Sequence, residues 1–168
     1  PVLLGLIAAM MPMTSCAISM EGKNWWLMQT LPIENKVIFN SKILTHLSVV
    51  LPFYVVSVIL SILALKPEPL GILWLILIPA AYILFSSVAG IAINLKFPIL
   101  DWENESRVVK QSASTMVTML VDMVLCLPPI ICLIAFKTIS VNIVMGVTLV
   151  LLILMTALFY QQNNRQPL

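Results

Sequence analysis

Long apolar runs separated by shorter polar stretches set the pattern of this chain. Five runs approach or exceed the length of about 20 residues that a helix needs to cross the hydrocarbon core of a bilayer. They cover residues 1–18, 43–65, 70–95, 113–136 and 141–160. Because backbone polar groups have no water to bind in lipid, each run is predicted to be helical. The pattern therefore predicts an all-α, polytopic transmembrane bundle of about five spans, forming a single region over residues 1–168.

The connections between the predicted spans alternate in length. Residues 19–42 and 96–112 form long polar loops, whereas residues 66–69 and 137–140 are very short and predict tight helical hairpins. Seven of the nine Lys and Arg residues lie on the side of the long loops and the C-terminal tail. Since positive residues concentrate in cytoplasmic loops, the long loops and the C-terminus are predicted to be cytoplasmic.

Composition supports the membrane class and removes several others. The chain is 61% hydrophobic and 10% charged, far from a soluble domain, so the lipid bilayer is its predicted surrounding. A net charge of +2, without a basic stripe, gives no reason to expect nucleic-acid binding. The sequence starts at Pro1 without a methionine, on the predicted outer side. We therefore expect it to be a piece of a longer protein, with at least one further helix upstream.

No pattern of catalytic or metal-binding residues stands out. Cys16, Cys126 and Cys132 fall in apolar runs without the spacing that a metal site needs, and we interpret them as small hydrophobic residues. The chain contains no G-x-x-x-x-G-K-[ST] phosphate loop and no hydrolase motif. It is therefore predicted to be neither an enzyme nor the holder of a metal or cofactor.

The first long loop combines charges with aromatic residues over too short a length for a domain. Trp25 and Trp26 suit the headgroup region, and Pro32 predicts an elbow between two short interfacial helices. The tryptophans could anchor the protein at the bilayer surface or dock a partner, and the residues alone leave both open. Likewise, the charges of the second loop, Asp101 to Lys110, could be a solvated, locally paired cluster or part of a docking surface.

Three polar positions inside the predicted spans are candidates for a role in the membrane. Asp122 lies about eight or nine residues into its span, so it should face the bundle interior or a watery cavity, or be protonated. It could contact a cationic group of a substrate, or it could be a structural partner. His46 is predicted one turn into its helix, reaching the interface. Ser86 and Gly90 predict a surface for close helix approach.

Two loop motifs resemble a known family. Ser19-Met20-Glu21-Gly22-Lys23, followed by Leu31-Pro32-Ile33 and a lysine before the next span, is similar to the cytoplasmic segment of bacterial type-2 ATP-binding-cassette (ABC) exporter permeases. The stretch from Asn94 to Glu105, followed by Val108-Val109-Lys110-Gln111-Ser112, resembles the next loop of an exporter branch of that family. The resemblance covers roughly Ser15 to Thr118.

The resemblance implies a permease in a bacterial cell membrane that moves substrate by alternating access. It also implies an ABC ATPase partner, which uses the ATP, and a second permease half. Glu21, Gly22 and Lys23 would start the coupling helix that meets the ATPase. Trp25, Trp26, Leu31 and Pro32 would fix the angle of that helix against the membrane.

Two other classes of function stay open beside the permease. A membrane scaffold or assembly factor would use the loops as anchors and show no nucleotide dependence. An ion-coupled carrier would be centred on Asp122 and should show inverted repeats. The two hairpins share only the pairs Leu51-Pro52 and Leu127-Pro128, at different depths.

Overall fold

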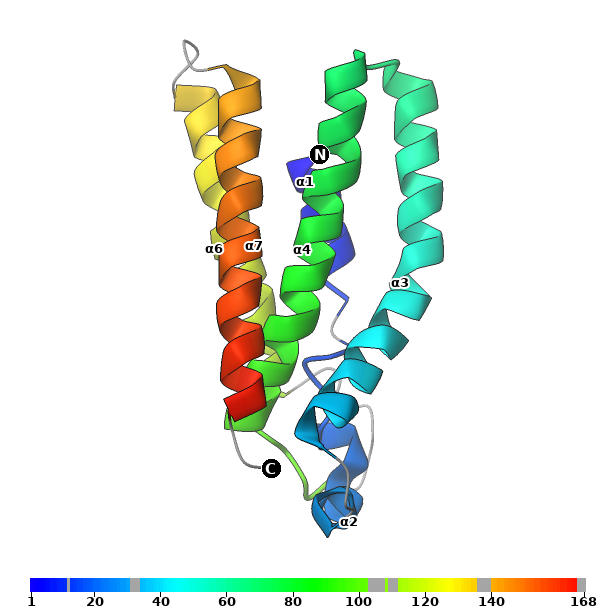
Figure 1. Cartoon of the computed structure of the whole chain (residues 1–168), viewed down its shortest axis with the longest axis vertical. Helices are drawn as coiled ribbons and strands as arrows, with labels where there is room; N and C mark the ends of the chain where they lie inside the picture. The colour runs from blue at the N-terminus through cyan, green and yellow to red at the C-terminus, as the bar shows by residue number, and fades with distance from the viewer. Residues whose placement is uncertain (12, 31–33, 103–107, 109–111, 136–139, 166–168) are drawn as a thin grey trace.

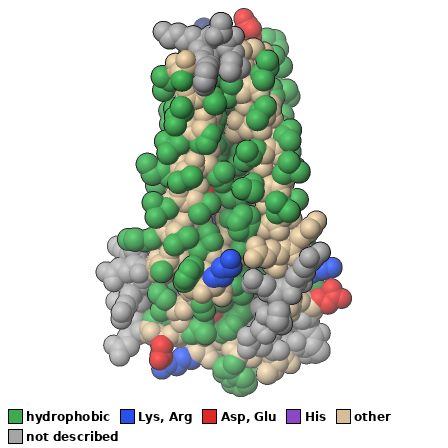
Figure 2. All heavy atoms as spheres, turned by 90° about the vertical axis from the view of Figure 1, so that its left-hand side faces the viewer, with side chains coloured by type: hydrophobic (Ala, Val, Ile, Leu, Met, Phe, Trp, Pro, Cys, Tyr) green, Lys and Arg blue, Asp and Glu red, His purple; other side chains and the backbone are tan. Residues whose placement is uncertain are grey.

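A computed structural model describes residues 1–11, 13–30, 34–102, 108, 112–135 and 140–165 of the chain (Figure 1). The fold is an all-α bundle, as predicted. Its helices, in chain order, are α1 (Val2–Ala9), the 3₁₀ helix η1 (Ser19–Asn24), α2 (Trp25–Thr30), α3 (Asn35–Leu65), α4 (Pro69–Lys96), α6 (Ala113–Ala135) and α7 (Val141–Arg165). On the face drawn in Figure 2, apolar side chains cover most of the length of the helix bundle, and charged side chains gather toward its two ends.

Four of the described helices, α3, α4, α6 and α7, are long and apolar enough to cross a membrane. The predicted span over residues 1–18 is wrong beyond Ala9. There α1 ends after eight residues, a rise of about 12 Å, and the described residues up to Ile18 form turns and bends. The apolar run continues past Ala9, so hydropathy did not show where the helix stops.

The other predicted boundaries differ mainly at α3. This helix starts at Asn35 rather than at residue 43, so the second of the two predicted interfacial helices is the first part of α3. The elbow predicted at Pro32 lies outside the described residues. The bounds of α4 and α6 lie within one residue of the predicted runs, whereas α7 continues to Arg165, past the predicted end at residue 160.

The long helices form two hairpins, α3–α4 and α6–α7, that stand side by side (Figure 1). The end of α3 and the start of α4 lie at the same end of the bundle as the end of α6 and the start of α7. The opposite end holds α2 and the last residues of α7. The two hairpins therefore point the same way, which is the arrangement that the alternating connections in the sequence predicted.

The central helix is α4, which packs against α1, α3, α6 and α7. Ile78, Tyr82, Phe85 and Ala89 of α4 are fully buried, and Phe85 meets Phe159 of α7 edge to face at 5.9 Å between ring centroids. In its most apolar stretch 61% of the residues are buried, against 11% for α3. The apolar surface of α3 therefore faces mostly away from the other helices.

Gly90 allows the chain that follows α1 to approach α4 closely. A Cβ atom at this position would lie 2.6 Å from Thr14 Oγ1 and 2.9 Å from the backbone nitrogen of Ser15. Ser86 and Gly90 predicted the close approach of a helix, and the structure shows a close approach at Gly90 by a segment that is not helical.

We expect Gly90→Ala to lower the free energy of unfolding by about 1–3 kcal/mol, because the added methyl group must displace backbone atoms in a packed interior. Gly146→Ala on α7 is the matched control, since its Cβ would meet only Trp74 at an ordinary 3.7 Å. The measurement is unfolding in mixed detergent micelles. Equal stabilities of the two variants would contradict the close packing at Gly90.

Candidate functional site

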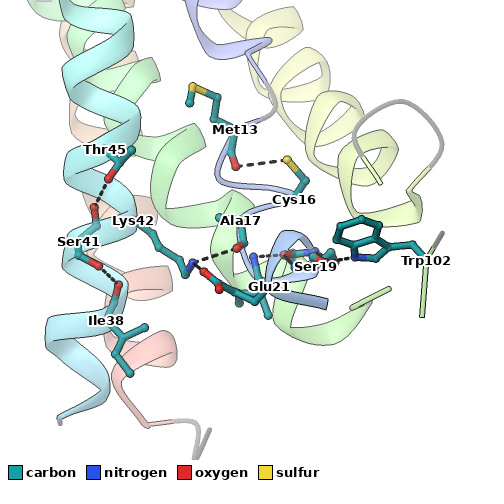
Figure 3. Close-up of polar contacts among 12 residues, drawn as sticks. Met13, Cys16, Ala17, Ser19, Glu21, Ile38, Ser41, Lys42, Thr45 and Trp102 are labelled. Atoms are coloured by element: carbon teal, nitrogen blue, oxygen red, sulfur yellow. Dashed lines mark hydrogen bonds and ion pairs between the residues drawn. The ribbon is translucent and has the colours of Figure 1, made fainter. Parts of the chain in front are cut away.

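Residues 14–25, here called the crossing segment, run across the ends of α3, α4 and α6 beneath the bundle (Figure 3). Thr14, Ser15, Ile18 and Ser19 are buried. Much of this backbone lies outside regular helices, so its N–H and C=O groups need partners from elsewhere. Side chains of the three neighbouring helix ends supply them.

Asn94, near the end of α4, makes the densest of these attachments. Its Oδ1 accepts from the backbone nitrogens of Ile18 (2.8 Å) and Ser19 (3.0 Å), and its Nδ2 donates to Ser19 Oγ (2.8 Å) and Ser114 Oγ (3.0 Å). Ser114 of α6 in turn donates to the carbonyl of Ser15 at 2.7 Å. An amide side chain has two acceptor positions and two donors, so Asn94 uses its full capacity.

Trp102 holds the segment from the other side. Its Nε1 donates to the carbonyl oxygen of Ser19 at 2.7 Å, and Ile99 N donates to Ser19 Oγ at 3.0 Å. A Cβ on Gly22 would lie 3.0 Å from Trp102 Nε1, and Gly22 has φ +54° and ψ −132°. Both the contact and the backbone conformation favour glycine here, so the structure explains why position 22 is a glycine.

Lys42 of α3 makes the third attachment (Figure 3). Its Nζ donates to the carbonyl of Ala17 at 3.0 Å and to Glu21 Oε1 at 2.7 Å. The Lys42 side chain is only 13% exposed, so this ion pair is shielded more than a surface pair. Nearby, burial raises the pKa of the Cys16 thiol above its usual value, and the charge of Lys42 opposes this more weakly.

The outward side of the crossing segment and of α2 is apolar and open. Trp26 is 62% exposed, and Leu27 and Met20 are exposed as well. Lys23 pairs with Asp101 at 3.3 Å, with both side chains almost fully in solvent. Trp25, by contrast, is buried against Ile18, Phe39 and Ile91. The two adjacent tryptophans thus face opposite ways.

A second group of polar residues lies within the bundle. Asp122 of α6 is fully buried, which confirms that it faces the interior, and Ser86 Oγ lies 2.7 Å from its Oδ2. His46 of α3 is also buried, with Nδ1 2.6 Å from Ser87 Oγ. The side chain of His46 therefore points into the bundle toward α4, whereas the sequence predicted that it would extend to the interface.

Comparison with known protein families gives one match. A family described as membrane proteins of 12 TMs (transmembrane segments) matches residues 2–161. The chain belongs to this family. No curated protein and no solved structure matches it.

In this member of the twelve-segment family, the predicted site residues divide between two sides of the crossing segment. Glu21 and Trp25 face the bundle and hold the segment in place, and Gly22 packs against Trp102. Lys23 and Trp26 face outward. Leu31 and Pro32 lie outside the described residues. Asp122 lies on α6 inside the bundle and is not part of this site.

Four residues that hold the segment escaped the sequence analysis as site residues: Ser19, Lys42, Asn94 and Trp102. Their signal was faint. Asn94 is the last polar residue of an apolar run before Lys96, and Trp102 is an isolated aromatic residue in a polar loop. Their partners lie 20 to 83 positions away along the chain, beyond the reach of any local pattern.

We expect Asn94→Ala to lower the free energy of unfolding by at least about 2 kcal/mol, because two buried backbone N–H groups lose their acceptor and each costs about 1–3 kcal/mol. Thr156→Val is the control, since Thr156 Oγ1 bonds only the Leu152 carbonyl of its own helix turn. Unfolding in mixed micelles measures both. A loss no larger than that of the control would show that Asn94 does not hold the segment.

Proposed function

We propose that this chain is the permease part of an ATP-binding-cassette exporter, which moves substrate across the membrane by alternating access. The proposal rests on the loop motifs around Ser19–Lys23 and Asn94–Glu105 together with one structural observation. The crossing segment is bonded on its inner side to the ends of three membrane helices, while the described side chains on its outer side, Met20, Lys23, Trp26 and Leu27, are exposed.

This arrangement suits the transmission of force. A push on the outer side would reach α4 and α6 through Asn94 and Ser114, and α3 through Lys42. The side chains that make these contacts are buried or nearly so, where hydrogen bonds are stronger than at a surface. Movement of the segment would therefore move the helix ends with it.

The geometry refines the roles that the resemblance implies. Trp26, Leu27 and Lys23 are the side chains available to an ATPase, because they are exposed on one side. Glu21 is turned toward Lys42, so its role in coupling is transmission to α3. An anchoring role in the headgroup region would use the same exposed tryptophan, and the experiments below distinguish the two.

The remaining parts of the proposal follow from the resemblance. The ATPase partner supplies ATP hydrolysis, because the sequence contains no phosphate loop. The ATPase meets the end of the bundle that carries α2, which is thereby the cytoplasmic side of a bacterial cell membrane. Twelve transmembrane segments, as in the family description, suit an assembly of two permease halves.

We expect Trp26→Ala in the full-length parent protein to abolish co-purification of an ABC ATPase in mild detergent. The exposed indole supplies apolar area to a docking surface, and its loss should leave the stability within about 0.5 kcal/mol, as for most surface substitutions. Leu63→Ala on α3 is the control, with a similarly exposed apolar side chain far from the segment. A wild-type protein that never brings an ATPase would favour the scaffold or the carrier.

We expect Lys42→Met to leave ATPase binding intact and to lower ATP hydrolysis by the complex several-fold. Methionine keeps the apolar stem but removes the contacts to Ala17 and Glu21, so α3 is no longer tied to the segment. Lys36→Met is the control, because Lys36 is exposed near the start of the same helix. Equal hydrolysis rates in the two variants would contradict transmission through Lys42.

A further inference from the structure

Two adjacent serines of α4 connect it to helices on different sides. Ser86 Oγ lies 2.7 Å from Asp122 Oδ2 of α6 and 2.9 Å from the carbonyl oxygen of Ala9, the last residue of α1. Ser87 Oγ lies 2.6 Å from His46 Nδ1 of α3 and 2.7 Å from the Ile83 carbonyl. The exporter proposal assigns no role to the buried acid or to the buried imidazole.

The hydrogen atoms around Ser86 can be counted. A hydroxyl group has one hydrogen, and a carbonyl oxygen can only accept, so Ser86 must donate to Ala9 for that 2.9 Å contact to be a hydrogen bond. The 2.7 Å contact to Asp122 then needs a hydrogen on the carboxyl group. Each contact is a full hydrogen bond of its own if Asp122 is a neutral acid that donates to Ser86, whereas an ionised Asp122 would leave two acceptors to share the one hydroxyl hydrogen.

An ionised Asp122 fits the same geometry poorly. Ser86 would have to donate to the carboxylate, leaving the Ala9 carbonyl facing a hydroxyl oxygen without a hydrogen between them. The other carboxyl oxygen, Oδ1, is buried and has no hydrogen-bond partner among the described residues. An ionised Asp122 would therefore have a single hydrogen bond within the membrane. Inserting a carboxylate at the centre of a membrane helix costs a free energy of about 2.5–3.5 kcal/mol even on insertion scales.

The described side chains packed around Asp122 supply no counter-charge, and the amino group of Pro1, at the start of α1, interacts with Cys126. The titratable side chains near Asp122 are Tyr82 of α4 and Cys126 one turn along α6, and both are neutral donors to backbone carbonyls, those of Leu125 and Val2. The membrane stretches of α1 and α7 contain no acidic or basic residue. His46, on α3, is bonded to Ser87 and not to Asp122.

We propose that Asp122 is a proton-binding site, which holds a proton in this arrangement of the helices and through Ser86 ties α6 to α4 and to the end of α1. The ligand is the proton itself. Separation of α6 from α4 would expose the carboxyl group and allow it to ionise, so proton occupancy and helix arrangement stabilise each other. This goes beyond the exporter proposal and does not depend on an ATPase.

Infrared spectroscopy of the purified full-length parent protein in lipid nanodiscs tests the proposal at neutral pH. The wild type should show the C=O stretching band of a protonated carboxyl group, sensitive to H₂O–D₂O exchange. Asp122→Asn should lack the band, whereas Asp101→Asn, at an exposed aspartate, should retain it. Absence of the band in the folded wild type, or its persistence in Asp122→Asn, would overturn the proposal.

Ser86→Ala provides a second test that keeps Asp122 in place, and so remains informative if Asp122→Asn does not fold. Removal of the hydroxyl group deprives the acid of its acceptor, so the band should persist and move to higher wavenumber. An unchanged band would show that the protonated group does not donate to Ser86 and would overturn the proposal. Neither measurement involves a nucleotide, so failure here is distinct from failure of the exporter proposal.

Discussion

The break in the helix after Ala9 is the constraint on which the rest of this structure depends. Backbone groups inside a membrane protein must be bonded, and a chain that leaves its helix while buried loses the partners that the helix provided. Here side chains of the neighbouring helices contribute them, two from α4 and one from α3. Ser86 binds the carbonyl of Ala9, Asn94 binds the nitrogens of Ile18 and Ser19, and Lys42 binds the carbonyl of Ala17.

The same requirement explains why polar side chains occur in otherwise apolar helices. Asn94 and Ser114 would be costly facing lipid, but next to an unpaired backbone they replace missing hydrogen bonds. The state of Asp122 follows from it as well, because Ser86 can donate only once and the Ala9 carbonyl needs that hydrogen. An acid on α6 is thus linked to a helix end on α1 through one hydroxyl group of α4.

The sequence was sufficient for the parts of the fold that depend on hydropathy alone. Runs of apolar residues located α4 and α6 to within a residue, and the alternating loops gave the two hairpins. It failed between Met10 and Ile18, where apolar residues continue but the helix does not, because burial and helicity are different properties. It also failed for the partners of Asn94, which depend on contacts 75 positions apart.

For the candidate site, the sequence located the region and the structure separated its two sides. Glu21 and Lys23 are two residues apart with opposite charges, and nothing in the local sequence shows which of them faces the bundle. The structure turns one toward Lys42 and leaves the other in solvent. The same holds for Trp25 and Trp26, since residues adjacent on a helix point about 100° apart. A loop motif therefore identifies a surface, and packing decides which of its residues are accessible.

The attachment of α3 has a mechanical consequence. Near one end Lys42 and His46 bind this helix to the rest of the molecule, and at the other end a short turn joins it to α4. A helix that is attached at both ends does not move as a rigid body about one of them, so α3 can change shape only by twisting or bending. Pro52 lies between these attachments and lacks the N–H that would complete the helical bonding, which favours a bend there. Because most of α3 faces away from its neighbours, a bend there would change few contacts within the protein. The helix can therefore bend while both of its ends stay attached.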